Sequence, residues 1–235
     1  MKHLPKAFVA AGIAGFAFAG TPASAAHIFT FDEEGDTASV TFSGQVNGDP
    51  APDVSALLGL TLDDISDDGL TYTFSYNLSN TSAVDSRIRS FGFDIENGDF
   101  ASATAGGGVY SNVNYDNNFP EGVGRLDVCF AASGGNNCTG GPNGLLSGQS
   151  ADGTFTLALN APIDGLQLSY FTTRFQSISP AVNGATSGVG IGAMTPAVPA
   201  VPEPSTWAMM LLGFFGVGAI MRRPAKAKRF SVAYS

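Results

Sequence analysis

Hydrophobic and polar residues alternate one by one along much of the middle of the chain. A period of two residues is typical of strands that bury one face. Stretches rich in glycine and asparagine, such as 134–137 and 139–144, separate the alternating segments and predict turns. We therefore predict eight to eleven short strands and an all-β fold, an antiparallel β-sandwich of jelly-roll type. The alternating segments are 28–31, 40–42, 70–78, 88–95, 124–130, 153–159 and 166–177.

The N-terminal end has the three parts of a secretory signal peptide. Lys2 and Lys6 precede an apolar run over residues 7–20, and residues 21–25 end in a small-residue A-x-A cleavage site. A buried N-terminal helix would leave the charged start and the small-residue end unexplained. We expect a signal-peptide helix within residues 1–25, removal by signal peptidase, and a mature chain that starts near Ala26.

The C-terminal end carries a short hydrophobic segment. Residues 207–221 form a run of fifteen without a charge, followed at once by Arg222 and Arg223. As a helix the run is only about 22 Å long, against a hydrocarbon core of about 30 Å. A core helix would need polar residues at helical spacing, and the run has none. We predict one short transmembrane helix at 206–221, with the basic tail 224–235 in the cytoplasm.

Charge is distributed unevenly along the 235 residues. The part from His27 to Pro204 holds all twenty acidic residues and four arginines, a net charge of −16. This charge repels the phosphates of nucleic acids, so we expect no nucleic-acid partner. The length that remains between the two ends fits one extracellular domain.

Near the C-terminus, Pro202, Glu203 and Pro204 are followed by Trp207 and Ala208, an apolar run and the basic pair Arg222 and Arg223. This order, over residues 202–223, resembles the PEP-CTERM sorting signal in its PEPxxWA variant. In that family an exosortase, a membrane-embedded cysteine protease-transpeptidase, recognises the tail and cleaves near the PEP. The resemblance implies an exported protein that is held transiently in the inner membrane and then reaches the cell surface or the extracellular space. The twelve residues after Arg223 depart from the family, whose tails usually end sooner.

Between the two ends we predict a β-sandwich ectodomain at 26–179, followed at 180–201 by a weak strand and a stalk rich in glycine, alanine and proline. Four segments of this ectodomain, 62–70, 86–94, 129–138 and 171–178, are similar to a PEP-CTERM subfamily named cistern. That similarity implies no known activity, catalytic residue or ligand.

Cys129 and Cys138 are the two cysteines of the chain and enclose eight residues. An even pair of cysteines in an exported protein predicts a disulfide. A metal or redox role would need further ligands or a CxxC spacing. We therefore favour a structural bridge.

Residues 64–69 partly match a calcium-binding loop, with oxygen ligands at Asp64, Ser66 and Asp68 and a glycine at position six. Position twelve is Ser75, where a helical calcium loop has a glutamate. Because strands flank this stretch, we favour a polar hairpin turn and keep calcium as a weak alternative. The acidic run 32–36 is likewise interpreted as a solvated turn.

Catalytic motifs are scarce. His27 is the only histidine after the signal peptide, and the sequence has no nucleophile elbow, P-loop or HExxH motif. Glu96 and Glu121 would have to lie close together to serve as a glycosidase pair, which the sequence alone does not establish. We expect no enzyme activity, no catalytic residue and no cofactor.

Two hypotheses for function follow. The first is a non-enzymatic surface or extracellular-matrix protein, associated with exopolysaccharide or biofilm, as the resemblance implies. The second is a carbohydrate-binding β-sandwich in which Tyr110, Tyr115 and Phe119 stack on sugars. The same three aromatic side chains would equally suit the core of the domain.

Overall fold

The computed structural model describes residues 28–66, 69–134 and 137–195. These residues form twelve strands, paired antiparallel, and no helix, which confirms the predicted all-β antiparallel fold. The predicted signal peptide, the sorting residues and the helix at 206–221 lie outside the described residues, as does the part of the predicted strand and stalk at 180–201 that follows residue 195. The strands are β1 Phe29–Phe31, β2 Thr37–Val46, β3 Asp49–Ile65, β4 Thr71–Asn80, β5 Asp85–Ile95, β6 Phe100–Ala105, β7 Asn112–Phe119, β8 Gly124–Ala131, β9 Leu145–Leu146, β10 Ser150–Leu159, β11 Leu166–Ser179 and β12 Gly188–Thr195.

Within those three segments, we find no helix with the length and hydrophobicity needed to cross a membrane.

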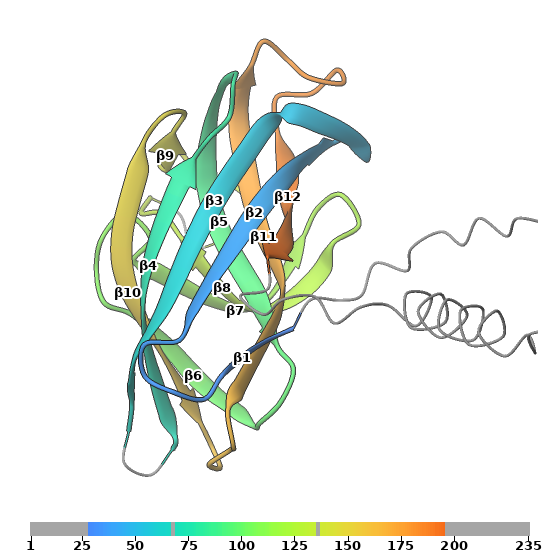
Figure 1. The fold of residues 1–235 in the computed structure, drawn as a ribbon. Helices are drawn as coiled ribbons and strands as arrows, with labels where there is room; N and C mark the ends of the chain where they lie inside the picture. Colours follow the sequence, from blue (N-terminus) through green and yellow to red (C-terminus); the bar gives the residue numbers. More distant parts are fainter. Residues whose placement is uncertain (1–27, 67–68, 135–136, 196–235) are drawn as a thin grey trace, which may run out of the picture.

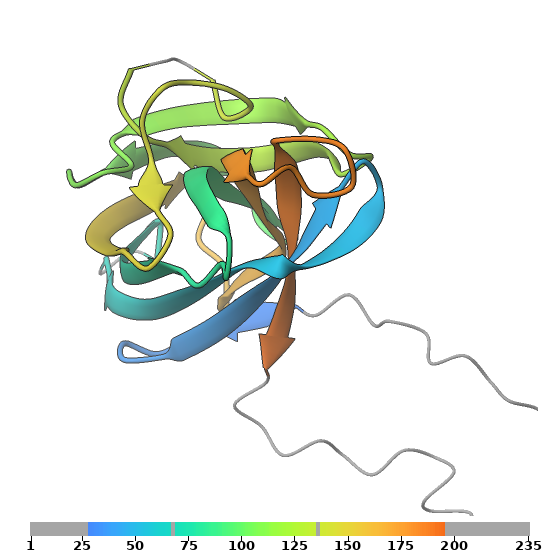
Figure 2. The same ribbon diagram turned by 90° about the horizontal axis from the view of Figure 1, so that it is seen from above.

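The strands form one sheet in the order β6-β10-β4-β3-β2-β12-β11-β5-β8-β7, with β1 paired to β11 and β9 to β5. The sheet curls until its two edge strands, β6 and β7, face each other, so that it nearly closes into a barrel (Figures 1 and 2). Tyr115 on β7 spans this seam: its hydroxyl donates to the Ala103 carbonyl at 2.7 Å and accepts from the Ala103 N–H at 3.0 Å. Among the strands that the structure describes, a side chain thus takes the place of strand pairing between the two edges of the sheet.

Strict alternation of apolar and polar residues explains why these segments are strands. In β2, buried Val40 and Phe42 alternate with exposed Ser39 and Thr41. The buried half of each strand fills the inside of the curled sheet, chiefly with aromatic rings. Phe155 is central there, with ring centroids 5.0 Å from Phe74 and 4.8 Å from Phe130. Each such side chain contributes about 2–3 kcal/mol through burial.

β12 is the weak strand predicted at 180–201, and it lies in the middle of the sheet, between β2 and β11. The domain therefore extends to Thr195, beyond the boundary predicted at residue 179. Its glycines permit close packing: a Cβ at Gly190 would lie 2.6 Å from Thr173 Cγ2, and one at Gly192 2.6 Å from Val40 Cγ1. The glycines that let β12 fit are also what weakened its strand signal in the sequence.

Candidate functional site

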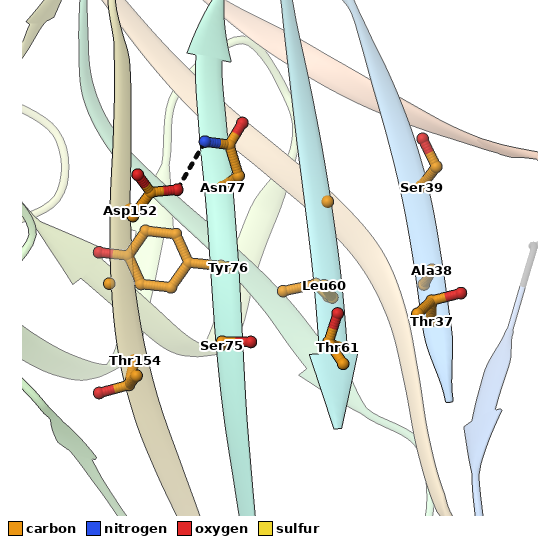
Figure 3. Close-up of a pocket in the computed structure, with 12 residues that line it drawn as sticks. Thr37, Ala38, Ser39, Leu60, Thr61, Ser75, Tyr76, Asn77, Asp152 and Thr154 are labelled. Atoms are coloured by element: carbon orange, nitrogen blue, oxygen red, sulfur yellow. Dashed lines mark hydrogen bonds between the residues drawn. The ribbon is translucent and has the colours of Figure 1, made fainter. Parts of the chain in front are cut away.

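A shallow hollow of about 820 Å³ lies on the outer surface of β2, β3, β4 and β10 (Figure 3). The strand register places residues from all four strands in straight rows across the sheet. One row consists of Ser39, Gly59, Asn77 and Asp152. The adjacent row consists of Thr37, Thr61, Ser75 and Thr154.

Gly59 leaves a gap in the first row. It lies between Ser39 and Asn77 and faces outward, like its neighbours on β3 at positions 57 and 61. A Cβ at this position would meet only the Asn77 carbonyl oxygen, at 4.0 Å. The glycine therefore is not required by packing, and its missing side chain deepens the hollow.

Hydrogen bonds between strands fix several of the polar side chains around the hollow. The Asn77 amide donates to Asp152 Oδ1 at 2.7 Å, as the dashed line in Figure 3 marks. The Ser79 hydroxyl donates to Asn77 Oδ1 at 3.2 Å and lies 2.7 Å from the Ser150 hydroxyl. These bonds hold the amide in one orientation before any ligand arrives.

The hollow is part of a larger surface, which we call the hydroxyl face. It consists of the sixteen outward-facing positions at every second residue of 37–43, 55–61, 73–79 and 150–156. Twelve of these sixteen are serine or threonine. The other four are Leu57, Gly59, Asn77 and Asp152, so the face offers short hydroxyl groups almost everywhere.

The hydroxyl face has no positive charge. β2, β3, β4 and β10 contain no lysine, arginine or histidine, and they contain five aspartates. The four arginines of the ectodomain lie instead on β5, β8 and β11. The electrostatics favour uncharged or cationic ligands over anionic ones.

Tyr76 lies beneath the edge of the hollow. It is 4% exposed, its ring contacts Phe91, and its hydroxyl reaches under Gly153, where a Cβ would be only 2.3 Å away. Within the described residues this hydroxyl has no hydrogen-bond partner. Burial, together with the negative charge of Asp152, raises the pKa of Tyr76 to about 12, so the phenol stays neutral.

A second polar region surrounds the predicted disulfide. Cys129 and Cys138 are bonded, as expected from the sequence. Arg89, fully buried on β5, donates through Nε to the Gly140 carbonyl at 2.9 Å and through Nη1 to the Ala132 carbonyl. Burial lowers the pKa of Arg89, although the guanidinium keeps its charge.

β11 holds the same loop from the other side. Arg174 donates to the Thr139 carbonyl at 3.2 Å and to the Gly188 carbonyl at 2.9 Å, and Gln176 donates to the Thr139 carbonyl at 3.2 Å. Three of the four segments that resemble the cistern subfamily, 86–94, 129–138 and 171–178, therefore meet at this loop. Their hydrogen bonds hold the loop against β5 and β11.

The aromatic side chains considered for sugar stacking do not form one surface. Tyr110 and Phe119 are buried, so they belong to the core, and the Tyr110 hydroxyl donates to the Ile88 carbonyl at 3.0 Å. Tyr115 is 48% exposed, but its hydroxyl is used at the β6–β7 seam. The stacking hypothesis is thus wrong for Tyr110 and Phe119.

The two glutamates considered for catalysis contact different parts of the fold. Glu96 follows β5 and accepts a hydrogen bond from the Ser169 hydroxyl. Glu121 lies in the β7–β8 turn and accepts from the Gly48 N–H at 2.8 Å. Neither lines the hollow.

The carboxyl group of Asp94, on β5, has a raised pKa. Partial burial is the main cause that raises the pKa of Asp94 to about 6, and the charges of Asp127 and Glu96 add to it. Asp94 Oδ1 accepts from the Asp127 N–H at 3.1 Å, and Asp127 Oδ2 accepts from the Ile95 N–H at 2.9 Å. These side chains continue the hydrogen bonding beyond the last β5–β8 pair.

The turns are polar, as predicted. In the β3–β4 hairpin the Ser66 hydroxyl accepts from the Thr71 N–H at 3.1 Å. Asp68 lies outside the described residues, so calcium binding by Asp64, Ser66 and Asp68 stays a prediction. In the run 32–36, Asp36 Oδ2 accepts from two backbone N–H groups, those of Asp32 and Glu33, and this lowers the pKa of Asp36.

Comparison with family models identifies one segment of the chain. Residues 200–223 match the model described as the PEP-CTERM protein-sorting motif, and this range contains all the sorting residues predicted above. The match does not extend to the β-domain, so the resemblance to the cistern subfamily stays a prediction. No curated protein and no solved structure matches the chain.

Proposed function

We propose a role for the β-domain from one premise. The chain is an exported protein with a PEP-CTERM sorting motif, processed by exosortase at the membrane and destined for the cell surface. The domain is a non-enzymatic component of the extracellular matrix that binds exopolysaccharide. Before processing, signal peptidase removes residues 1–25, and the segment 206–221 anchors the chain in the inner membrane.

The hydroxyl face is the observation that carries this proposal. A serine or threonine hydroxyl both donates and accepts hydrogen bonds, as the hydroxyls of a sugar do. With twelve such residues on sixteen positions, the face can exchange hydrogen bonds with a polyhydroxylated polymer over four strands. The individual contacts are weak, but many copies on one cell surface bind the same polymer together and raise the overall strength.

A non-enzymatic role agrees with the residues that line the hollow. Glycoside hydrolysis ordinarily uses two carboxyl groups on either side of the scissile bond. Among the lining residues Asp152 is the only carboxylate, and it is hydrogen-bonded to Asn77. The hollow is therefore equipped to hold a polymer rather than to cleave it.

Fractionation of cells that produce the protein tests the proposal. We expect mass spectrometry to find an N-terminus near Ala26 and, only when the exosortase is present, a C-terminus near Pro202–Pro204. The processed protein should then co-sediment with exopolysaccharide purified from the same cells. A full-length chain in the cytosol, or a processed chain that never sediments with the polymer, would contradict the proposal.

A further inference from the structure

We infer that the hydroxyl face binds an uncharged, extended polysaccharide whose chain lies across β2, β3, β4 and β10 and occupies the hollow at Gly59. This inference rests on the proposed function. It adds the class of polymer, its position over the hollow at Gly59 and the direction in which it runs.

The direction follows from the spacing of the rows. Neighbouring strands are about 4.8 Å apart, and outward-facing residues along one strand are about 6.7 Å apart. The rings of an extended polysaccharide, each linked to the next through opposite sides of the ring, repeat at close to the distance between strands. A polymer that runs from Ser39 past Gly59 and Asn77 to Asp152 therefore places one ring over each strand.

The shape of the hollow accepts such a chain. Gly59 leaves room in the middle of the row, with nothing closer to a Cβ there than the Asn77 carbonyl oxygen at 4.0 Å. Leu57, two residues away on β3, is 41% exposed and borders the row on one side. Its methyl groups can cover the C–H face of a sugar ring, which water solvates poorly.

The polar groups around the hollow divide into two sets. Asn77, Ser75 and Asp152 are bonded to protein groups, which fixes their positions. The hydroxyls of Ser39, Thr61 and Thr154 have no hydrogen-bond partner within the described residues, so they can bond to a ligand. Both rows therefore combine fixed groups with groups that are available to a ligand.

The absence of cations from these four strands selects the class of polymer. On the hydroxyl face a polyanion would meet the carboxylate of Asp152 and no compensating lysine or arginine. A polycation would be drawn to the acidic domain as a whole, and salt would screen that attraction. An uncharged polysaccharide has no such charge attraction, so its binding depends on hydrogen bonds to the hydroxyl rows.

Gly59→Tyr is the variant that tests the site. A tyrosine at this position fills the hollow, has space around its Cβ and favours strand conformation. Thr30→Tyr places the same side chain at an exposed position of β1 and serves as the matched control. Circular dichroism and thermal unfolding verify that both variants fold like the wild type.

Binding is measured by co-sedimentation of the processed protein, in 150 mM salt, of the order of physiological ionic strength. The probes are the native exopolysaccharide, cellulose as an uncharged glucan and alginate as a polyanion. We expect the wild type to bind the native polymer and cellulose but not alginate. Gly59→Tyr should lower binding to both at least tenfold, and Thr30→Tyr should leave it within twofold.

The outcomes separate the inference from the proposed function. If folded Gly59→Tyr binds the native polymer as well as the wild type does, the site is wrong while the proposed function stands. Binding to alginate instead of cellulose overturns the uncharged class alone. If the wild type does not bind the native polymer, the proposed function itself fails.

Discussion

Replacement of Arg89 by methionine tests whether a buried arginine holds the disulfide loop in place. Arg89 is fully buried and donates to four loop carbonyls, those of Ala132, Ser133, Asn137 and Gly140. Methionine keeps most of the aliphatic length of the side chain and removes every donor. The carbonyls then lose a charged partner without a large change in packing volume.

The cost can be estimated from these contacts. A hydrogen bond to a charged group contributes about 1.5–3 kcal/mol. Ser133 and Asn137 are exposed, so their carbonyls can bind water instead, and the Ala132 carbonyl keeps a bond from the Asn112 amide at 3.3 Å. Relief of the buried charge offsets part of the remaining loss. We expect a net destabilisation of about 3 kcal/mol, which corresponds to a drop in melting temperature of roughly 6–12 °C.

Thermal unfolding of the purified β-domain, followed by circular dichroism, measures this effect. Arg125→Met is the matched control, because Arg125 pairs with Asp116 on the surface, with 65% of its side chain exposed. The control should melt within about 2 °C of the wild type. Arg89→Lys keeps the charge but lacks the planar array of N–H donors. It should therefore show most of the destabilisation expected for Arg89→Met. An Arg89→Met domain that melts like the control would refute the reasoning.

Two further substitutions test the buried polar groups. The pKa of Asp94 is raised from 3.8 to about 6, so protonation stabilises the fold below pH ~4 and this gain is lost as the pH rises through 6. Asp94→Asn should therefore melt like the wild type at pH 4. At pH 7 it should be more stable than the wild type by about 1 kcal/mol, after allowance for solvent screening. A stability difference that does not change with pH would count against the raised pKa of Asp94. Because the Tyr76 hydroxyl is buried without a protein partner, Tyr76→Phe should raise the free energy of unfolding in urea by about 1 kcal/mol. A loss of stability would mean that this hydroxyl has a bonding partner.

The outward-facing residues of each strand, at every second position, carry a sequence signal for the hydroxyl face. In β4 the residues between Tyr72, Phe74 and Tyr76 are threonine and serine, and β2 and β10 repeat this choice. Taken strand by strand, short hydroxyls at outward positions are ordinary. They become a surface only because the register aligns the consecutive strands β2, β3 and β4 with β10, whose partners on β4 lie 71 to 87 residues away in the chain.

Arg89 illustrates a different limit of sequence analysis. A charged residue inside an alternating segment is normally assigned to the solvent side. Its burial depends on the loop around Cys138, which is brought over β5 by the disulfide and by β11. No local pattern encodes such a contact.

By itself, the sequence determined the properties that depend on neighbouring residues. These are the all-β class, the polar turns, the cysteine pair and the sorting motif at 200–223. The tertiary structure decided the rest: one curled sheet, β12 in its middle, and the rows of hydroxyls around Gly59. The physical reason is that alternation with period two fixes which face of a strand is buried. Register and strand order instead depend on how side chains from distant strands pack together.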